Sequence, residues 1–203
     1  MDPEMQAWLD RLFGETDRDG VDKLADFEEF CRADEATFRL LAEVCENPAK
    51  WLAPYSEACV AQAFWDLHTY VLSDLGRAHI GLDLLLRLFC SYEVLFREYF
   101  AVRCGPELGH LGEGGPLNGV CYLWWDMDCW YAIPRDVSML RSILAIEHPA
   151  CQESALHGLG LERRSGGAGS EVEGIIDEFL ERHANLIPGL REYALLARRG
   201  MIQ

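Results

Sequence analysis

The sequence predicts an all-α protein, and three observations lead to that prediction. Half of the 203 residues are hydrophobic, so the chain can bury a sizeable core. The last third of the chain consists of short amphipathic segments joined by tight polar or Gly-rich turns. In the clearest of these segments, residues 171–182, the apolar side chains recur at the spacing of one helix face. They are Val172, Ile175, Ile176, Phe179 and Leu180.

The amino-terminal half is expected to form four helices, the last of them long and central. Their apolar spacing places them at residues 3–13, 24–45, 57–75 and 82–102. Asp34 is placed to cap a second segment within the second helix, which ends at Asn47-Pro48. Ser56 is placed to cap the third helix.

The carboxyl-terminal half is expected to add four shorter helices. They lie near residues 135–147, 149–159, 171–183 and 189–199. Ser170 and Glu173 have the spacing of a capping box in front of the third of them. The Gly-rich stretches 105–119 and 160–170 are predicted to be flexible loops, and the whole chain, 1–203, is predicted to be one helical domain.

Part of the carboxyl-terminal third resembles a known repeat class. The stretch 151–160, the helix at 172–180 and the run Leu190-Arg191-Glu192-Tyr193-Ala194 resemble HEAT or armadillo-like repeats of uncharacterised bacterial proteins. In those repeats, helices with small residues, as in Ala155-Leu156-His157-Gly158, pack closely on their neighbours. The resemblance covers about residues 134–203 and implies helical hairpins there. Because no repeat period continues upstream, we expect an irregular α-α superhelix.

The chain is strongly acidic. Its net charge is −16 and its pI about 4.7, and its first fifty residues hold fourteen acidic against six basic side chains. Such a surface repels nucleic acids and anionic membranes and suits a basic protein partner. Charged residues interrupt the longest apolar stretch, residues 80–104, so we expect no transmembrane span.

The eight cysteines indicate a reducing compartment. The first residues are acidic where a secretion signal would be basic, and most of the cysteines lie within apolar helical patterns. We therefore expect reduced core thiols in a cytoplasmic protein. Because burial raises a thiol pKa, these cysteines are expected to be unreactive.

Three sets of residues are candidate metal ligands. Residues 15–26 place acids at positions one, three, five and twelve of an EF-hand-like loop, with Gly20 at position six. Asp22 occupies the position where an apolar residue is needed and no second loop follows, so a solvated acidic turn is the preferred interpretation. The set His148, Cys151 and His157 has no zinc-like spacing, nor does Cys104 with His110. We expect no metal and no cofactor.

Catalytic motifs are also lacking. No serine lies in a nucleophile elbow, and the glycine-rich stretch 105–119 has no lysine and carries Glu107 and Glu113, which would repel a phosphate. The sequence therefore predicts a protein that is not an enzyme.

The most unusual local feature is the aromatic cluster at residues 122–131. One interpretation is a binding groove beside the glycine-rich loop, with aromatic anchors and carboxylates. Its candidate residues are Trp124, Trp125, Asp126, Asp128, Trp130 and His110. The alternative, favoured because aromatic stripes are usually core, is a central buried helix with the two aspartates at its rim.

Two functions follow as hypotheses. The first is an acidic cytosolic interaction module or scaffold, in a specific version an immunity-type protein that neutralises a basic partner. The alternative is a small-molecule-binding or enzymatic helical domain with its pocket at the helix from Trp124 to Tyr131.

Overall fold

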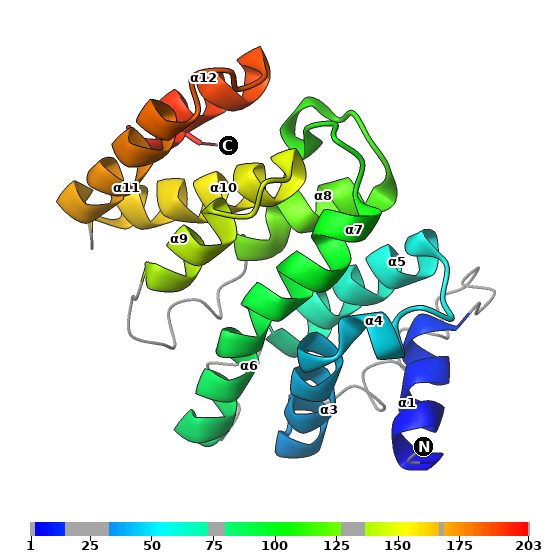
Figure 1. Cartoon of the computed structure of the whole chain (residues 1–203). Helices are drawn as coiled ribbons and strands as arrows, with labels where there is room; N and C mark the ends of the chain where they lie inside the picture. Colours follow the sequence, from blue (N-terminus) through cyan, green and yellow to red (C-terminus); the bar gives the residue numbers. More distant parts are fainter. Residues whose placement is uncertain (1–2, 15–32, 73–79, 127–136, 167–168, 203) are drawn as a thin grey trace. The chain divides into compact units, whose positions relative to one another are not determined.

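The computed structural model describes residues 3–14, 33–72, 80–126, 137–166 and 169–202, and within these ranges it contains helices and no strand (Figure 1). The all-α prediction is therefore confirmed, while the superhelical repeat arrangement stays a prediction. The contacts divide the chain into two compact units, while the single helical domain over 1–203 stays a prediction. Unit 1 comprises Met1–Leu95 with Met127–Ile133, and unit 2 comprises Phe96–Asp126 with Pro134–Gln203.

Unit 1 is built from amphipathic helices whose apolar faces form its core. Its elements are α1 (Pro3–Phe13), α3 (Glu35–Glu46), α4 (Pro48–Trp51), α5 (Glu57–Leu67), the π-helical segment η1 (His68–Leu72) and α6 (Leu82–Leu95). α3 packs along α6, and α1 packs on α5, where the ring of Phe13 meets Phe64 edge-on at 5.7 Å. These contacts bury the hydrophobic stripes that the sequence periodicity indicates.

Local capping chemistry begins two of these helices where the sequence predicts. Asp34 accepts a hydrogen bond from the backbone N–H of Thr37 at 2.9 Å, and Ser56 accepts one from that of Cys59 at 3.2 Å. Each side chain satisfies an N–H group that has no partner within its own helix.

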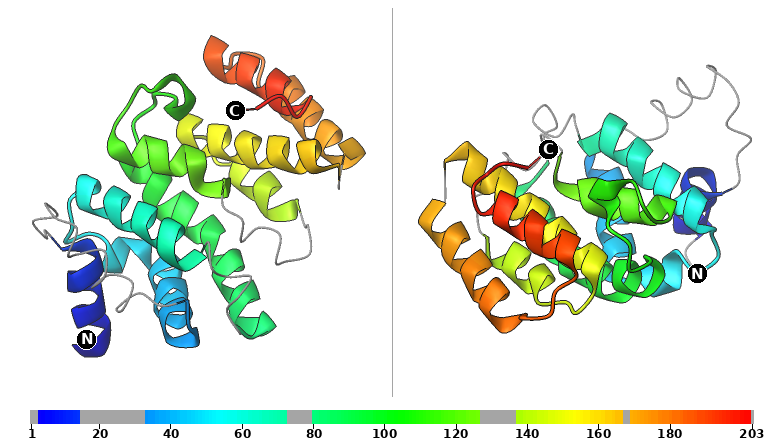
Figure 2. Two further views of the ribbon diagram at one scale, coloured as in Figure 1. Left: turned by 180° about the vertical axis from the view of Figure 1, so that it is seen from behind. Right: turned by 90° about the horizontal axis from the view of Figure 1, so that it is seen from above.

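Unit 2 surrounds one long helix. Its elements are η2 (Phe96–Phe100, π), α7 (Ala101–Arg103), η3 (Gly109–Leu111, 3-10), α8 (Pro116–Tyr122), η4 (Leu123–Trp125, 3-10), α9 (Ser138–Leu144), α10 (Pro149–Ser165), α11 (Gly169–Arg182) and α12 (Pro188–Ala197). α10 packs against α8, α9, α11 and α12, and α12 can be followed across it in Figure 2. A helix contacted on so many sides is buried around nearly its whole circumference.

The glycines of α10 explain why the predicted loop over 160–170 is wrong. α10 continues to Ser165 and ends at Gly166, whose φ of 80° is left-handed. A Cβ on Gly158 would lie 2.7 Å from Leu140 Cδ2, and one on Gly160 would lie 2.8 Å from Ile202 Cγ1. These glycines therefore permit close helix approach, and tertiary contacts outweigh their low helix propensity.

Two further expectations are corrected locally. α11 begins at Gly169, so Ser170 lies inside the helix, and Glu173 forms ion pairs with Arg163 (2.7 Å) and Arg198 (3.7 Å) in place of the capping box. The stretch 105–119, predicted to be a loop, contains the 3-10 turn η3 and the first residues of α8.

Candidate functional site

Buried polar side chains gather on α10. Nine polar or charged residues are recorded as buried in the described part of the chain, and five of them belong to this helix. They are Gln152, Glu153, Ser154, His157 and Glu162. A buried polar group is costly unless it is hydrogen-bonded, so the partners of these side chains define what the site can do.

His157 is fully buried and joins two other elements. Its Nε2 lies 2.9 Å from Asp126 Oδ1, and its Nδ1 lies 2.6 Å from the hydroxyl of Tyr193 on α12. Because an ionised carboxylate only accepts hydrogen bonds, the Nε2 atom carries the hydrogen of this contact. Tyr193 is also hydrogen-bonded to the hydroxyl of Tyr122 on α8, at 3.2 Å. The imidazole thus fixes the orientation of the Asp126 carboxylate.

A second pair of side chains, Glu153 and His110, belongs to the same cluster. The side chain of Glu153 is fully buried and accepts hydrogen bonds from the backbone N–H groups of Gly109 (2.7 Å) and His110 (3.1 Å). Its carboxylate also contacts Nδ1 of His110. The His110 ring lies 4.5 Å from the ring of Tyr193, so the aromatic rings connect the two pairs.

Gly109 allows the backbone of the η3 turn to come within hydrogen-bonding distance of Glu153. A Cβ on Gly109 would lie 2.7 Å from Tyr122 Cβ and 2.8 Å from the carbonyl oxygen of Asn118. Only a residue without a side chain lets the η3 turn approach α8 and α10 closely enough for its N–H groups to reach Glu153.

The cluster keeps its phenols protonated. Burial is the largest cause that raises the pKa of Tyr193, and the neighbouring Tyr122 and the carboxylates of Glu153 and Asp126 raise it further. Burial likewise raises the pKa of Tyr122. Both hydroxyls therefore keep their protons at neutral pH, because ionising either would place a charge beside two carboxylates. The Tyr193 hydroxyl donates a hydrogen bond to that of Tyr122.

Solvent reaches this cluster at two side chains. The Asp126 side chain is 40% exposed and that of His110 is 20% exposed, whereas His157 and Glu153 have no exposed side-chain surface. Asp126 is hydrogen-bonded to His157 and His110 contacts Glu153, and water reaches neither of these two partners. This arrangement presents a positioned carboxylate and an imidazole at the surface of unit 2.

The six sequence-predicted site residues fall into three groups. Asp126 and His110 belong to this cluster. Trp124 and Trp125 are buried and pack against Phe96, with ring centroids 6.0 and 5.7 Å away. Asp128 and Trp130 lie outside the described residues, as does the EF-hand-like segment 15–26.

Sequence reasoning missed four members of the cluster as site residues: Tyr122, Glu153, His157 and Tyr193. One pattern pointed to two of them. Glu153 and His157 are four residues apart, and therefore on one face of a helix, in a stretch otherwise composed mostly of small and apolar residues. The two tyrosines gave no such indication, since aromatic residues at helical spacing are ordinary core residues.

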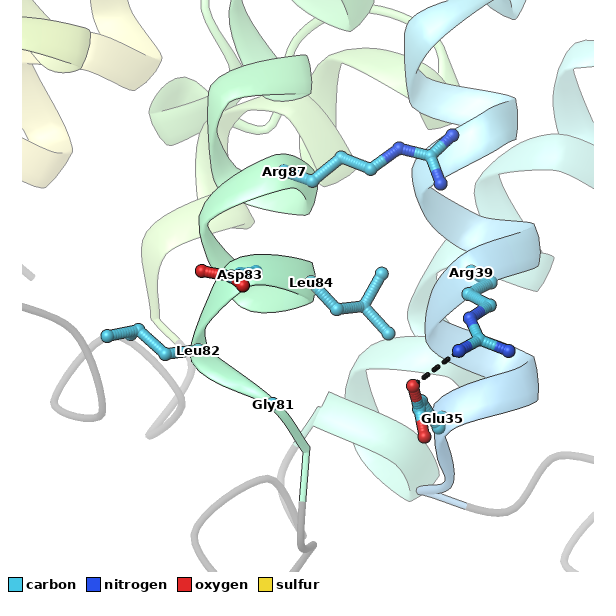
Figure 3. A pocket seen from close by; sticks show the side chains of 7 residues that line it. All are labelled: Glu35, Arg39, Gly81, Leu82, Asp83, Leu84 and Arg87. Carbon is cyan, nitrogen blue, oxygen red and sulfur yellow. Dashed lines mark hydrogen bonds and ion pairs between the residues drawn. The ribbon is translucent and has the colours of Figure 1, made fainter.

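A hollow of about 450 Å³ lies in unit 1, between α3 and the start of α6 (Figure 3). Its charged side chains are of both signs. Arg39 pairs with Glu35 at 2.5 Å, and Arg87 pairs with Glu46 through two contacts of 2.6 and 2.7 Å. Both guanidinium groups are thus satisfied by carboxylates, and no titratable cluster comparable to that of unit 2 lines this hollow.

In the described ranges, no group of three or more His, Cys, Asp or Glu side chains is arranged to hold a metal ion, and none of the helices there is long and apolar enough to cross a bilayer. No protein-family model, curated protein or solved structure matches the chain.

Proposed function

We propose that the protein binds a small organic cation at the polar cluster of unit 2, through Asp126 and His110. The observation that carries this proposal is the hydrogen bond from fully buried His157 to half-exposed Asp126. A carboxylate held by a buried partner loses little side-chain freedom when a ligand arrives, and preorganisation of this kind strengthens binding.

Burial favours binding over catalysis. A general base must come within hydrogen-bond reach of the proton that it abstracts. His157, Tyr193 and Glu153 are covered by neighbouring helices, so they position the accessible groups and do not touch the ligand.

The charge and the rings favour a cation. The chain carries a net charge of −16, which raises the local concentration of cations. At the site itself, the Asp126 carboxylate is close enough to Tyr122 to raise the pKa of that phenol, and the His110 ring lies 6.2 Å from the Tyr122 ring. Carboxylates with aromatic rings are suited to ammonium groups.

The test is a titration with 1,4-diaminobutane, compared with the neutral 1,4-butanediol, followed by NMR chemical shifts. We expect the diamine to shift resonances at the cluster and the diol to shift none. Asp126→Asn should weaken the diamine about tenfold or more, because a hydrogen bond to a charged group contributes about 1.5–3 kcal/mol.

Glu178→Gln is the matched control, because Glu178 is a half-exposed carboxylate of the same unit that is paired with Arg141 at 2.6 Å. It should leave the affinity for the diamine unchanged. Equal shifts with diamine and diol, or equal losses in the two variants, would refute the proposal.

A second candidate function is an interaction module for a basic protein, including the immunity-type version. It is favoured by the charge of unit 1, which holds twenty acidic residues against eight basic ones. Long-range attraction from such a surface would accelerate association with a basic partner and would weaken with added salt.

This candidate is tested by capture from lysate at low and high salt. A single basic protein recovered at low salt and depleted at high salt is the expected result. The double variant Glu35→Lys/Asp83→Lys in unit 1 should lose it, whereas Glu171→Lys/Glu181→Lys, the same charge change in unit 2, should retain it. Equal capture by both variants would rule out recognition through unit 1.

A further inference from the structure

Three cysteines from three segments of unit 2 lie near one another. Cys121 lies on α8, Cys151 in the first turn of α10, and Cys104 directly after α7. The thiol of Cys121 lies 3.5 Å from the carbonyl oxygen of Ala150, the residue before Cys151, and it is close enough to the thiols of Cys104 and Cys151 for each to affect its pKa. Cys121 and Cys151 are fully buried, and Cys104 is 8% exposed.

Backbone carbonyls accept hydrogen bonds from the two buried thiols. Cys121 donates to the carbonyl oxygen of Ala150 at 3.5 Å, and Cys151 donates to that of Phe96 at 3.7 Å. Carbonyl oxygens only accept hydrogen bonds, so both contacts favour the protonated thiol.

The two thiols differ in how readily they lose that proton. Burial, together with its thiol neighbours, raises the pKa of Cys121. The neighbouring Cys121 thiol and, to a smaller extent, His148 together lower the pKa of Cys151 to about 6, against the opposing effect of burial. Nδ1 of His148 is buried and has no hydrogen-bond partner in the structure. The nucleophilic form of a cysteine is the thiolate, so Cys151 is the more reactive of the pair.

Cys45 in unit 1 shows what burial does without such neighbours. It is fully buried with Ser91 as its polar contact, and burial raises its pKa far above the ordinary value. The difference between Cys45 and Cys151 thus comes from the second thiol and the imidazole.

We propose that Cys121 and Cys151 form a reversible disulfide when the protein is exposed to hydrogen peroxide. The Cys151 thiolate attacks one peroxide oxygen, the O–O bond breaks, and hydroxide leaves and takes up the thiol proton as water. The sulfur is now a sulfenic acid. The Cys121 thiol then attacks that sulfur, the S–S bond forms, and a second water leaves. Two thiols are oxidised by two electrons and one peroxide is reduced to two waters.

The bond would join α8 to α10, the helices that carry Tyr122, Glu153 and His157 of the polar cluster. Oxidation would therefore restrain the two helices that carry the candidate ligand site. The inference itself does not depend on that site, because it needs only the thiols and the peroxide.

The test is mass spectrometry of the folded chain after brief peroxide treatment and alkylation of the remaining thiols. We expect a tryptic cross-link between the peptide with Cys121 and the peptide with Cys151, located by fragmentation, a thiol count lower by two, and full reversal by dithiothreitol. Cys121→Ser and Cys151→Ser should each abolish the cross-link, whereas Cys90→Ser, at an exposed position in unit 1, should retain it.

Circular dichroism establishes that each variant is folded, and the unaltered chain decides the matter if a variant is not. A product in which Cys104 replaces either partner would overturn the proposal. So would oxidation of exposed Cys90 to its sulfinic acid while Cys121 and Cys151 remain thiols.

Discussion

The two units place their polar groups differently. Unit 1 carries most of the net charge, with twenty acidic residues against eight basic ones, and its buried polar residues in the described ranges are Thr37, His68 and Ser91. Unit 2 holds fourteen acidic residues against ten basic ones but buries a hydrogen-bonded network on α10. An apolar core is specified by size and shape, whereas a polar core also requires a partner for each donor and acceptor. Unit 2 is therefore where single side chains are expected to matter most.

Removing the buried Glu153 carboxylate should lower the free energy of unfolding more than any other change considered below. Glu153→Ala leaves the N–H groups of Gly109 and His110 without their acceptor, and each buried donor left unsatisfied costs about 1–3 kcal/mol. Urea denaturation measures the loss. Glu178→Ala, which removes an exposed ion pair, should cost about 0–1 kcal/mol. Similar costs for the two variants would mean that the buried network does not stabilise unit 2.

In the described part of unit 1, the buried histidine His68 should make stability depend on pH. Burial lowers the pKa of His68 to about 3, below the unfolded value of about 6.5. Between these values the unfolded chain binds the additional proton, so this contribution is complete above pH 6.5 and is lost as the pH falls, at up to ~1.4 kcal/mol per pH unit.

Urea denaturation between pH 4 and 7 measures this slope. His68→Gln should reduce it by the equivalent of one proton, because the amide does not titrate. If the slope of unfolding free energy against pH is unchanged in the variant, the acid sensitivity belongs to groups other than His68.

A pair of glycines tests how closely α10 is packed. Gly158→Ala places a Cβ 2.7 Å from Leu140 and 3.0 Å from the Trp125 ring, and overpacking of this kind costs about 1–3 kcal/mol. Gly174→Ala in α11 meets no atom within 4 Å and should stabilise by up to ~1 kcal/mol through helix propensity. Thermal melts of the two variants should therefore move in opposite directions. A rise in both melting temperatures would show that a methyl group at position 158 fits beside Leu140 and Trp125.

The candidate site was only partly predictable. Asp126 and His110 stood out because a carboxylate and an imidazole flank an unusual aromatic run and a Gly-rich stretch. Glu153 and Tyr193 did not stand out, because their roles depend on partners 43 and 36 residues away in the chain, His110 and His157. Nothing local to either residue identifies those partners.

The same limit applies to the cysteines. Burial of Cys45, Cys121 and Cys151 follows from their apolar surroundings in the sequence, and it is confirmed. The meeting of Cys121 with Cys151 could not be predicted, since residues 30 positions apart on different helices carry no spacing that relates them.

By itself, the sequence determined the all-α class, the capped starts of α3 and α5, and the apolar faces of α1, α3 and α11. These depend on the 3.6-residue period and on caps that act within three residues, so they are local. Only the tertiary structure decided that α10 continues through Gly158 and Gly160 and that its polar side chains find partners on η3, η4 and α12. Such contacts join residues distant in the chain, and their free energy outweighs local propensity.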